Sequence, residues 1–236
     1  AALNTFFTTA GNITYLGAAN NATTRTLTTT VSDGVFSVNT TSSITLAAVN
    51  DAPTLGAIGV SGTEDTTLTF TAVNFTGAYT DPESAALASI TIATLPATGT
   101  LKLSGVDVTA SQVITTANLA NITYVPAANE NGAKTFTVTA SDGSLSSAAA
   151  TVTMTLAAVN NAPTLTSVST LTGATEDTAF TISYAALAAA ANEADVDGDT
   201  LSFRVEAVST GSLTKSDVAV TAGSTLLNSG ESFVWT

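Results

Sequence analysis

The side chains best suited to chemistry in this 236-residue chain are carboxylates gathered in a few short segments. The chain has 18 Asp and Glu residues against 5 Lys and Arg residues. Most of the acidic residues lie in segments that recur: Asp33, Asp51, Glu64, Asp65, Asp81, Glu83, Asp142, Glu176, Asp177, Asp195, Asp197 and Asp199. Because so few basic side chains are present to neutralise them, the clusters favour a bound cation, and Ca²⁺ accepts the mixture of Asp, Asn and carbonyl oxygens found here.

The composition excludes several other classes of function. A formal net charge of −13 disfavours nucleic acids and anionic membrane surfaces as partners. The chain has no His and no Cys, which removes disulfides, imidazole or thiolate zinc sites and the commonest general base. It also has no Gly-x-Ser-x-Gly nucleophile motif, so we expect no enzyme activity. No apolar run approaches the roughly 20 residues of a membrane helix, so we expect no membrane contact in this segment.

The acidic segments recur because the sequence itself repeats. LAAVNDAPTL (46–55) returns as LAAVNNAPTL (156–165), NITY (12–15) returns at 121–124, and TEDT (63–66) returns at 175–178. Repetition at about 110 residues marks a tandem array of domains. We expect the C-terminal half of a repeat with its linker over residues 1–53, a complete repeat over 54–160 and the N-terminal part of a third over 161–236. Any export signal or anchor is expected outside this sequence.

The complete repeat contains about seven short segments rich in β-branched residues and separated by Gly, Pro, Asn, Asp or Ser. They cover residues 67–72, 88–95, 100–103, 112–115, 121–125, 134–140 and 150–156. Alternation predicts two inward-facing sets: Phe136, Val138 and Ala140, and Val152, Met154 and Leu156. This pattern predicts an all-β fold of tandem Greek-key β-sandwiches, each of about 110 residues.

Two segments invite other interpretations. The Ala-rich stretch 182–194 could form one or two helical turns or an irregular loop. The segment DVDGDTLSFRVE places Asp195, Asp197, Asp199 and Glu206 as in an EF-hand loop. Thr200 stands where such a loop needs its turn glycine, and the residues that follow alternate as a strand, so we do not expect an EF-hand.

In their order along the repeat, the motifs resemble the bacterial cadherin-like tandem repeats of large extracellular surface proteins and adhesins. The resemblance covers the whole chain and rests on the glutamate of TEDT, the acidic pair of DPE, the aspartate of TASDG and the linker ending in NDAP or NNAP. It implies an immunoglobulin-like sandwich on the bacterial surface or secreted outside the cell. It also implies Ca²⁺ at each junction between repeats.

Carried over residue by residue, the resemblance implies two ligand sets. The first junction would use Asn50, Asp51, Asp81, Glu83 and Asp142, and the second would use Glu64, Asn160, Asn161, Asp195 and Asp197. The fuller cadherin linker carries a further aspartate where this chain has Ala48 and Ala158, so we expect about one or two ions per linker. The alternative is that NDAP forms only a turn, in which Asn and Asp are favoured by local hydrogen bonds.

These expectations favour a calcium-rigidified stalk, spacer or adhesive filament whose partners are the neighbouring repeats of the same chain. Two alternatives stay open. One is a module that binds carbohydrate or a host or cell-surface ligand, although Tyr15, Tyr124 and Trp235 occupy equivalent, core-like strand positions rather than an exposed platform. The other is a calcium-independent filament in which neighbouring copies complete each other's terminal half-repeats.

Overall fold

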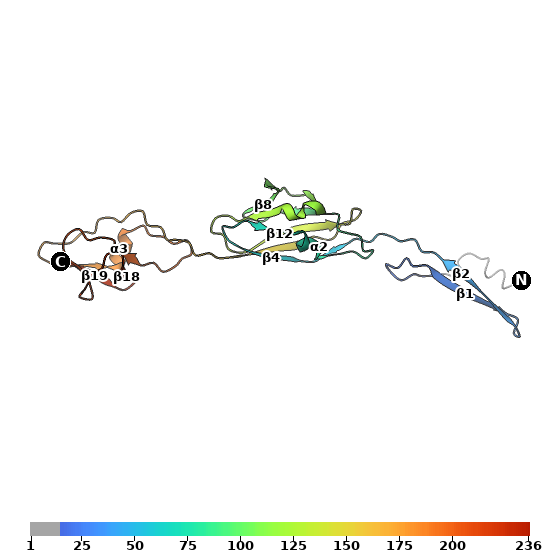
Figure 1. Ribbon diagram of the computed structural model, residues 1–236. Helices are drawn as coiled ribbons and strands as arrows, with labels where there is room; N and C mark the ends of the chain where they lie inside the picture. The colour runs from blue at the N-terminus through green and yellow to red at the C-terminus, as the bar shows by residue number, and fades with distance from the viewer. Residues whose placement is uncertain (1–14) are drawn as a thin grey trace. The chain divides into compact units, whose positions relative to one another are not determined.

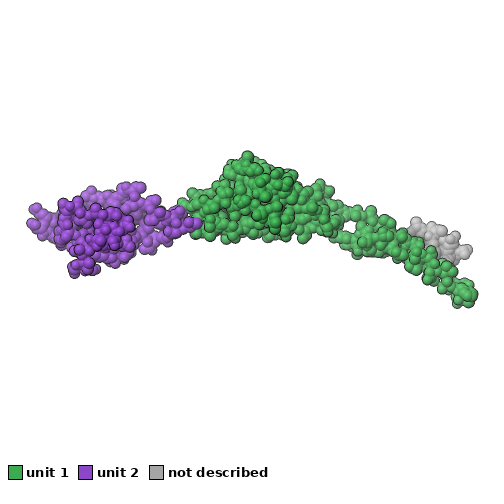
Figure 2. All heavy atoms as spheres, in the orientation of Figure 1, with its two compact units in different colours: residues 1–158 green, residues 159–236 purple. Residues whose placement is uncertain are grey.

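The computed structural model describes residues 15–236. These residues divide into two compact units, whose boundary lies between Ala158 and Val159 (Figures 1 and 2). The first unit contains the segment predicted as a half-repeat and the complete repeat. The second contains the predicted start of a third repeat. The beginning of the half-repeat predicted for residues 1–53, including most of its NITY segment, lies outside the described residues.

The first element described in the first unit is a two-stranded antiparallel hairpin of β1 (Arg25–Ser32) and β2 (Ser37–Ile44). An aspartate closes its turn: Asp33 Oδ1 accepts hydrogen bonds from the backbone N–H groups of Val35 at 2.9 Å and Phe36 at 2.7 Å. Gly34 follows at φ 95°, a left-handed conformation that favours glycine.

The rest of the first unit is a complete β-sandwich, which confirms the predicted fold class. One sheet has five strands in the order β10 (Val113–Thr115), β7 (Ser89–Thr94), β12 (Gly132–Ser141), β13 (Ala150–Ala157) and β4 (Ile58–Thr63). The other has four, in the order β5 (Leu68–Thr69), β11 (Ile122–Val125), β8 (Thr100–Leu103) and β9 (Val106–Asp107). A short pair, β3 (Thr54–Leu55) and β6 (Tyr79–Thr80), follows the linker.

One hydrophobic core joins the two sheets. The predicted inward sets are confirmed, because Phe136, Val138, Ala140, Val152, Met154 and Leu156 are all buried. Phe136 packs edge-on against Phe70, with ring centroids 5.9 Å apart, and Phe70 also contacts Phe75 at 5.7 Å. The threonines that alternate with these residues point outward, as a sheet with one solvated face requires.

Several elements of this sandwich differ from the sequence expectation, among them the short strands β3, β6 and β9, which were not predicted. β4 pairs in parallel with β13, although its two glycines, Gly59 and Gly62, weaken the strand pattern. The strand expected over 67–72 ends early, because Thr71 and Asn74 form a capping box that starts helix α2 (Ala72–Thr76). The 3₁₀ helix η1 (Thr116–Asn121) was also not predicted.

The second unit repeats the smaller sheet of the first. Its strands run in the order β14 (Phe180–Ser183), β19 (Ser232–Trp235), β16 (Leu213–Lys215) and β17 (Val218–Ala219). A separate pair is formed by β15 (Phe203–Arg204) and β18 (Leu226–Leu227). Helix α3 (Tyr184–Ala190) confirms the helical interpretation of the Ala-rich segment, and its N-cap Ser183 Oγ accepts from Ala186 N at 3.1 Å.

Candidate metal-binding site

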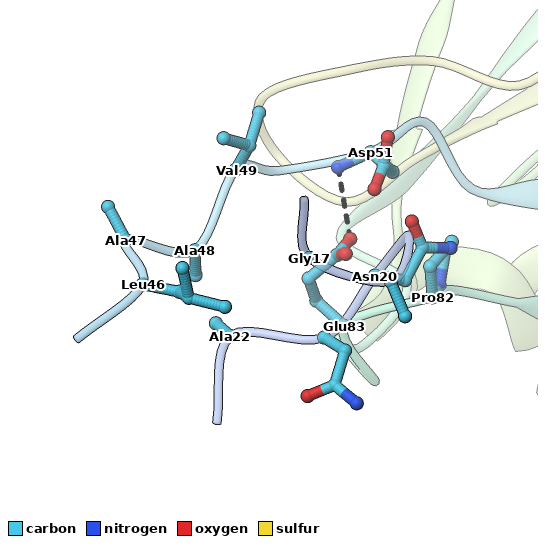
Figure 3. A pocket seen from close by; sticks show the side chains of 12 residues that line it. Gly17, Asn20, Ala22, Leu46, Ala47, Ala48, Val49, Asp51, Pro82 and Glu83 are labelled. Atoms are coloured by element: carbon cyan, nitrogen blue, oxygen red, sulfur yellow. Dashed lines mark hydrogen bonds between the residues drawn. The ribbon is translucent and has the colours of Figure 1, made fainter. Parts of the chain in front are cut away.

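The linker before the complete sandwich is held by two acidic side chains of that sandwich. The Asp51 N–H donates to Glu83 Oε2 at 3.0 Å, and Asn50 Nδ2 donates to Asp142 Oδ2 at 2.7 Å (Figure 3 shows the first). Glu83 belongs to the DPE segment after β6, and Asp142 to the turn after β12. The structure therefore brings together four of the five residues assigned to the first junction.

Asp81, the fifth residue, organises the DPE turn. Its Oδ1 accepts from the backbone N–H groups of Glu83 and Ala85, both at 2.9 Å. Its Oδ2 is buried and, like the Tyr79 hydroxyl, makes no hydrogen bond of normal geometry, although the Asp81 carboxylate lies close enough to that hydroxyl to raise its pKa. Burial raises the pKa of Tyr79, and the negative charges of Asp81 and Asp142 raise it further.

Asp142 is held in its charged form by its surroundings. Its Oδ1 accepts from Ser144 N at 2.6 Å and Leu145 N at 2.7 Å. Together with the stronger contribution from the Asn50 side chain, these hydrogen bonds lower the pKa of Asp142 below its ordinary value of 3.8. The same turn geometry recurs at Asp33 in the β1–β2 hairpin.

The second linker repeats the contact seen in the first. The Asn161 N–H donates to Asp197 Oδ2 at 2.6 Å, as the Asp51 N–H does to Glu83. Asp195 Oδ1 accepts from the N–H groups of Asp197 at 2.9 Å and Asp199 at 3.2 Å, which reproduces the turn at Asp81. The tandem repeat thus extends to individual hydrogen bonds.

The other two residues assigned to the second junction are Asn160 and Glu64. Asn160 is exposed in the linker. Glu64 is buried, with 1% of its surface exposed, and its N–H donates to Ala157 O at 3.0 Å. Glu64 belongs to the first unit and the other four residues of the second set to the other unit, so the structure describes that set only as two separate parts.

Sequence reasoning missed two asparagines beside the first linker. A pocket at this linker is lined by Asn20, Asn21, Asp51 and Glu83, among others (Figure 3). Asn20 has φ 54°, and its counterpart in the next repeat, Asn129, has φ 57°. The recurrence of AAN at 18–20 and 127–129 was the sequence signal that could have identified this position.

The chemical type of the candidate ligands fits a hard cation. All candidate ligands offer oxygen atoms, which Ca²⁺ prefers. Zinc prefers nitrogen and sulfur ligands, which this set does not provide. The buried Asp81 Oδ2 is one further oxygen that a cation could contact. Within residues 15–236, however, no group of three or more Asp, Glu, His or Cys side chains converges on one point. A cation here would therefore need amide and backbone oxygens in addition to carboxylates.

The aromatic side chains at equivalent strand positions serve the fold. Tyr124 Oη donates to Thr98 O at 3.0 Å, and Trp235 Nε1 donates to the equivalent Thr210 O at 3.2 Å. Tyr124 is fully buried. The expectation of a core-like strand position is wrong for Tyr15, which is 47% exposed and lies outside the strands of the structure.

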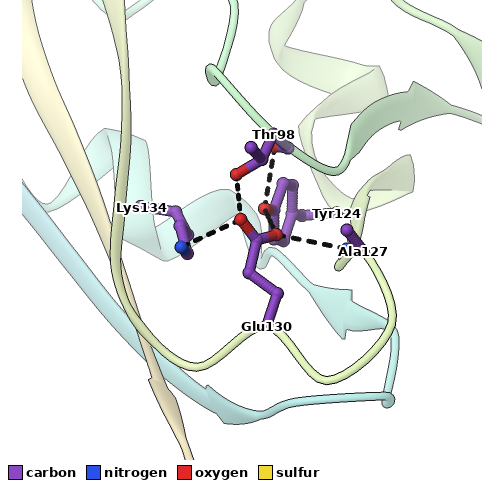
Figure 4. A network of polar contacts seen from close by, with 5 residues as sticks. All are labelled: Thr98, Tyr124, Ala127, Glu130 and Lys134. Carbon is purple, nitrogen blue, oxygen red and sulfur yellow. Dashed lines mark hydrogen bonds and ion pairs between the residues drawn. The ribbon is translucent and has the colours of Figure 1, made fainter.

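A polar network fixes the loop beyond Tyr124 (Figure 4). Glu130 accepts hydrogen bonds from Thr98 Oγ1, from Tyr124 Oη at 3.4 Å and from Ala127 N at 3.2 Å, and it pairs with Lys134 Nζ at 2.9 Å. Because this carboxylate is surrounded by donors from its own sandwich, we assign it a structural role.

Comparisons with known proteins agree with this architecture. Residues 50–155 match the bacterial Ig domain, and residues 159–225 match the cadherin-like domain. These two segments are thus similar to bacterial Ig-like and cadherin-like domains, the class that the motifs predicted. Domains of these families are typical of extracellular surface proteins. None of the helices in the described part of the chain is long and apolar enough to cross a membrane.

One solved structure similar to this chain is an endo-fucoidan hydrolase of glycoside hydrolase family 107. The two share 16% sequence identity with a TM-score of 0.28, and the match covers 91% of this chain but 29% of the hydrolase chain. A likeness this distant carries no conclusion about activity. The comparison with curated proteins gave no match.

Proposed function

We propose that this chain is a non-enzymatic segment of an extracellular bacterial stalk or spacer whose linkers are rigidified by Ca²⁺. The observation that carries the proposal is the repeated linker contact, Asp51 N–H to Glu83 and Asn161 N–H to Asp197. In both repeats, the chain leaving one domain is bonded to an acidic turn of the next. A contact of this kind removes freedom from the linker, which is what a spacer needs.

The first linker would hold the ion through Asp51, Asp81, Glu83, Asp142 and the amide oxygen of Asn50. When bound, the ion would supply the positive charge that offsets repulsion among these carboxylates. Asp81 has its Oδ1 committed to two backbone N–H groups and its buried Oδ2 in no hydrogen bond of normal geometry. A cation bound at that oxygen would leave the hydrogen bonds of the turn intact.

The test is thermal unfolding at fixed ionic strength with 10 mM CaCl₂, 10 mM MgCl₂ or excess chelator. At a dissociation constant of about 10⁻⁴ M, this calcium concentration stabilises the folded state by roughly 2.7 kcal/mol per site, or several degrees of melting temperature. The double variant D81N/E83Q should lose the calcium-specific shift at the first linker. D107N is the matched control, because Asp107 of β9 pairs with Lys102 of β8, outside the proposed ligand set, and its substitution should leave the shift unchanged.

A melting temperature that does not respond to calcium would overturn the proposal and leave the acidic segments as turns alone. An equal response to magnesium would also contradict it, because a dedicated Ca²⁺ site uses oxygen ligands in a geometry that Mg²⁺ accepts poorly.

A further inference from the structure

All five basic residues of the chain stand in β-strands. They are Arg25 in β1, Lys102 in β8, Lys134 in β12, Arg204 in β15 and Lys215 in β16. Loops, turns and linkers make up more than half of the described residues, and none of these segments contains Lys or Arg. The basic residues are therefore absent from the irregular parts of the chain.

The two linkers show this bias most clearly. Residues 45–53 and 158–163 contain Asp51 and several asparagines but no basic residue. The first linker forms no strand up to Pro53, and its Val49 is 75% exposed. Irregular, exposed segments of this kind are the usual sites of proteolytic nicking. A cut in a linker would separate the segments on either side of it, whereas sheet contacts hold the pieces together after a cut inside a sandwich.

Strand pairing covers the backbone at the basic residues of the central sandwich. Lys102 pairs with Thr123 on one side and Asp107 on the other, so both edges of β8 are occupied at this position. Lys134 pairs with Met154 of β13. An endoprotease binds its substrate as an extended segment through main-chain hydrogen bonds, in the manner of an added strand. These two backbones can be bound only after the sheet opens locally, which slows cleavage.

Ion pairs also occupy the basic side chains. Four of the five pair with a carboxylate of their own unit: Lys102 with Asp107, Lys134 with Glu130, Arg204 with Glu206 and Lys215 with Glu231. The side chains of Lys102 and Lys134 are only 29% and 22% exposed. A protease that is specific for Lys or Arg recognises that side chain with a carboxylate in its own pocket. Each ion pair therefore competes with recognition by the protease.

We propose that the linkers and loops of this chain withhold cleavage sites from endoproteases that cut after Lys or Arg. Such an enzyme meets its residues only in paired strands, while the exposed segments offer it none. In an extracellular spacer, this placement keeps consecutive domains joined in the presence of trypsin-like proteases. The protection does not depend on the calcium site. It does not extend to proteases of other specificities, which find suitable residues in the linkers.

Limited proteolysis of the V49K variant tests the placement within one molecule. V49K adds a lysine to the exposed first linker, whereas Lys102 and Lys134 remain in their strands. With trypsin under native conditions and in chelator, we expect cleavage after residue 49 to be roughly 100-fold faster than after Lys102 or Lys134, because cleavage in a strand requires local opening. T153K is the matched control, since Thr153 of β13 is paired on both sides and its new lysine should stay uncut. Mass spectrometry of the fragments identifies each cut.

The wild-type chain supplies the second comparison. Trypsin should leave both linkers intact and the central sandwich whole, while proteinase K, which has broad specificity, should cut the linkers under the same conditions. Cleavage of the native wild-type chain after Lys102 or Lys134 at the rate seen after residue 49 in V49K overturns the proposal. A V49K linker that resists trypsin, or a wild-type linker that resists proteinase K, also overturns it, because the linker would then be protected by its own structure.

Discussion

Asn50 Nδ2 donates to Asp142 Oδ2 at 2.7 Å, although the two residues stand 92 positions apart. Asn50 lies in the linker before the sandwich, and Asp142 lies in the turn between its two longest central strands, β12 and β13. One hydrogen bond therefore ties the entry of the domain to its final hairpin. The same bond makes the largest contribution to the lowered pKa of Asp142.

Substituting Asn50 by Ala should raise the pKa of Asp142 toward its ordinary value of 3.8. A carboxyl with a depressed folded-state pKa stabilises the fold above its unfolded pKa, and that stabilisation is lost as pH falls through the lowered folded value. In N50A, the stability that the Asp142 carboxylate loses as pH falls below about 3.8 should therefore be smaller than in the wild-type protein. NMR titration of the Asp142 carboxyl measures its pKa in the wild-type protein and in N50A. N118A, which removes an exposed side chain of η1, is the control, and an unchanged Asp142 pKa in N50A would contradict the assignment.

Substituting Gly99 by Ala should destabilise the central sandwich more than the same change at Gly105. Both glycines have positive φ, 67° and 84°, and so both substitutions carry a backbone penalty of about 1–2 kcal/mol. A Cβ at Gly99 would also overlap the Tyr124 side chain, whereas a Cβ at Gly105 meets nothing within 4 Å. The overlap should cost G99A about 1–3 kcal/mol more, measurable by urea denaturation. Equal losses would show that the Tyr124 contact has no energetic role.

Substituting Glu130 by Gln should make the central sandwich less sensitive to acid. Burial alone would raise the pKa of Glu130, but hydrogen bonds from Thr98, Lys134 and Ala127 hold it below its usual 4.5. The carboxylate therefore stabilises the fold above about pH 4.5, and this contribution disappears as pH falls through the lowered value.

Melting temperatures of the wild-type protein and E130Q should differ at pH 7 and converge toward pH 3. E206Q is a suitable control, because Glu206 is an exposed partner of Arg204 in the other unit. A constant difference between wild type and E130Q from pH 7 to pH 3 would mean that the charge of Glu130 is unimportant to the network.

The strands of the complete sandwich were largely predictable because their inward residues alternate. Phe136, Val138 and Ala140 follow a period of two, and the sheet buries all three. β4 and α2 were missed because their formation depends on tertiary and local context. β4 forms a strand through its parallel pairing with β13, and a capping box starts α2 inside a segment of β-forming residues. Neither effect has a periodic signal in the sequence.

The candidate site was predictable as a set of motifs but not as a set of contacts. Repetition located Asp51 and Glu83, yet it could not show that one contributes its backbone N–H and the other a carboxylate oxygen. Asn20 and Asn21 were missed because neutral asparagines are frequent in this chain and do not stand out from turn residues. Their position beside the linker follows only from the folded structure.

The two linkers differ at one position, and exchanging those residues tests whether charge there controls the calcium response. Asp51 of the first linker corresponds to Asn161 of the second, and each donates its backbone N–H to an acidic side chain. N161D keeps that N–H but adds a carboxylate near Asp195 and Asp197. In chelator the added charge should lower the melting temperature of the 159–236 unit, because like charges repel. In calcium it should enlarge the stabilising shift, because Ca²⁺ affinity rises with ligand charge.

D51N should do the reverse at the first linker, with a smaller calcium shift and a slightly higher melting temperature in chelator. Calorimetry of both variants with calcium and with chelator measures all four values. N118D is the matched control for an added charge, because Asn118 lies on η1, outside the proposed ligand sets. If N161D behaves like N118D in both conditions, position 161 does not take part in cation binding, and the linker contact is a turn alone.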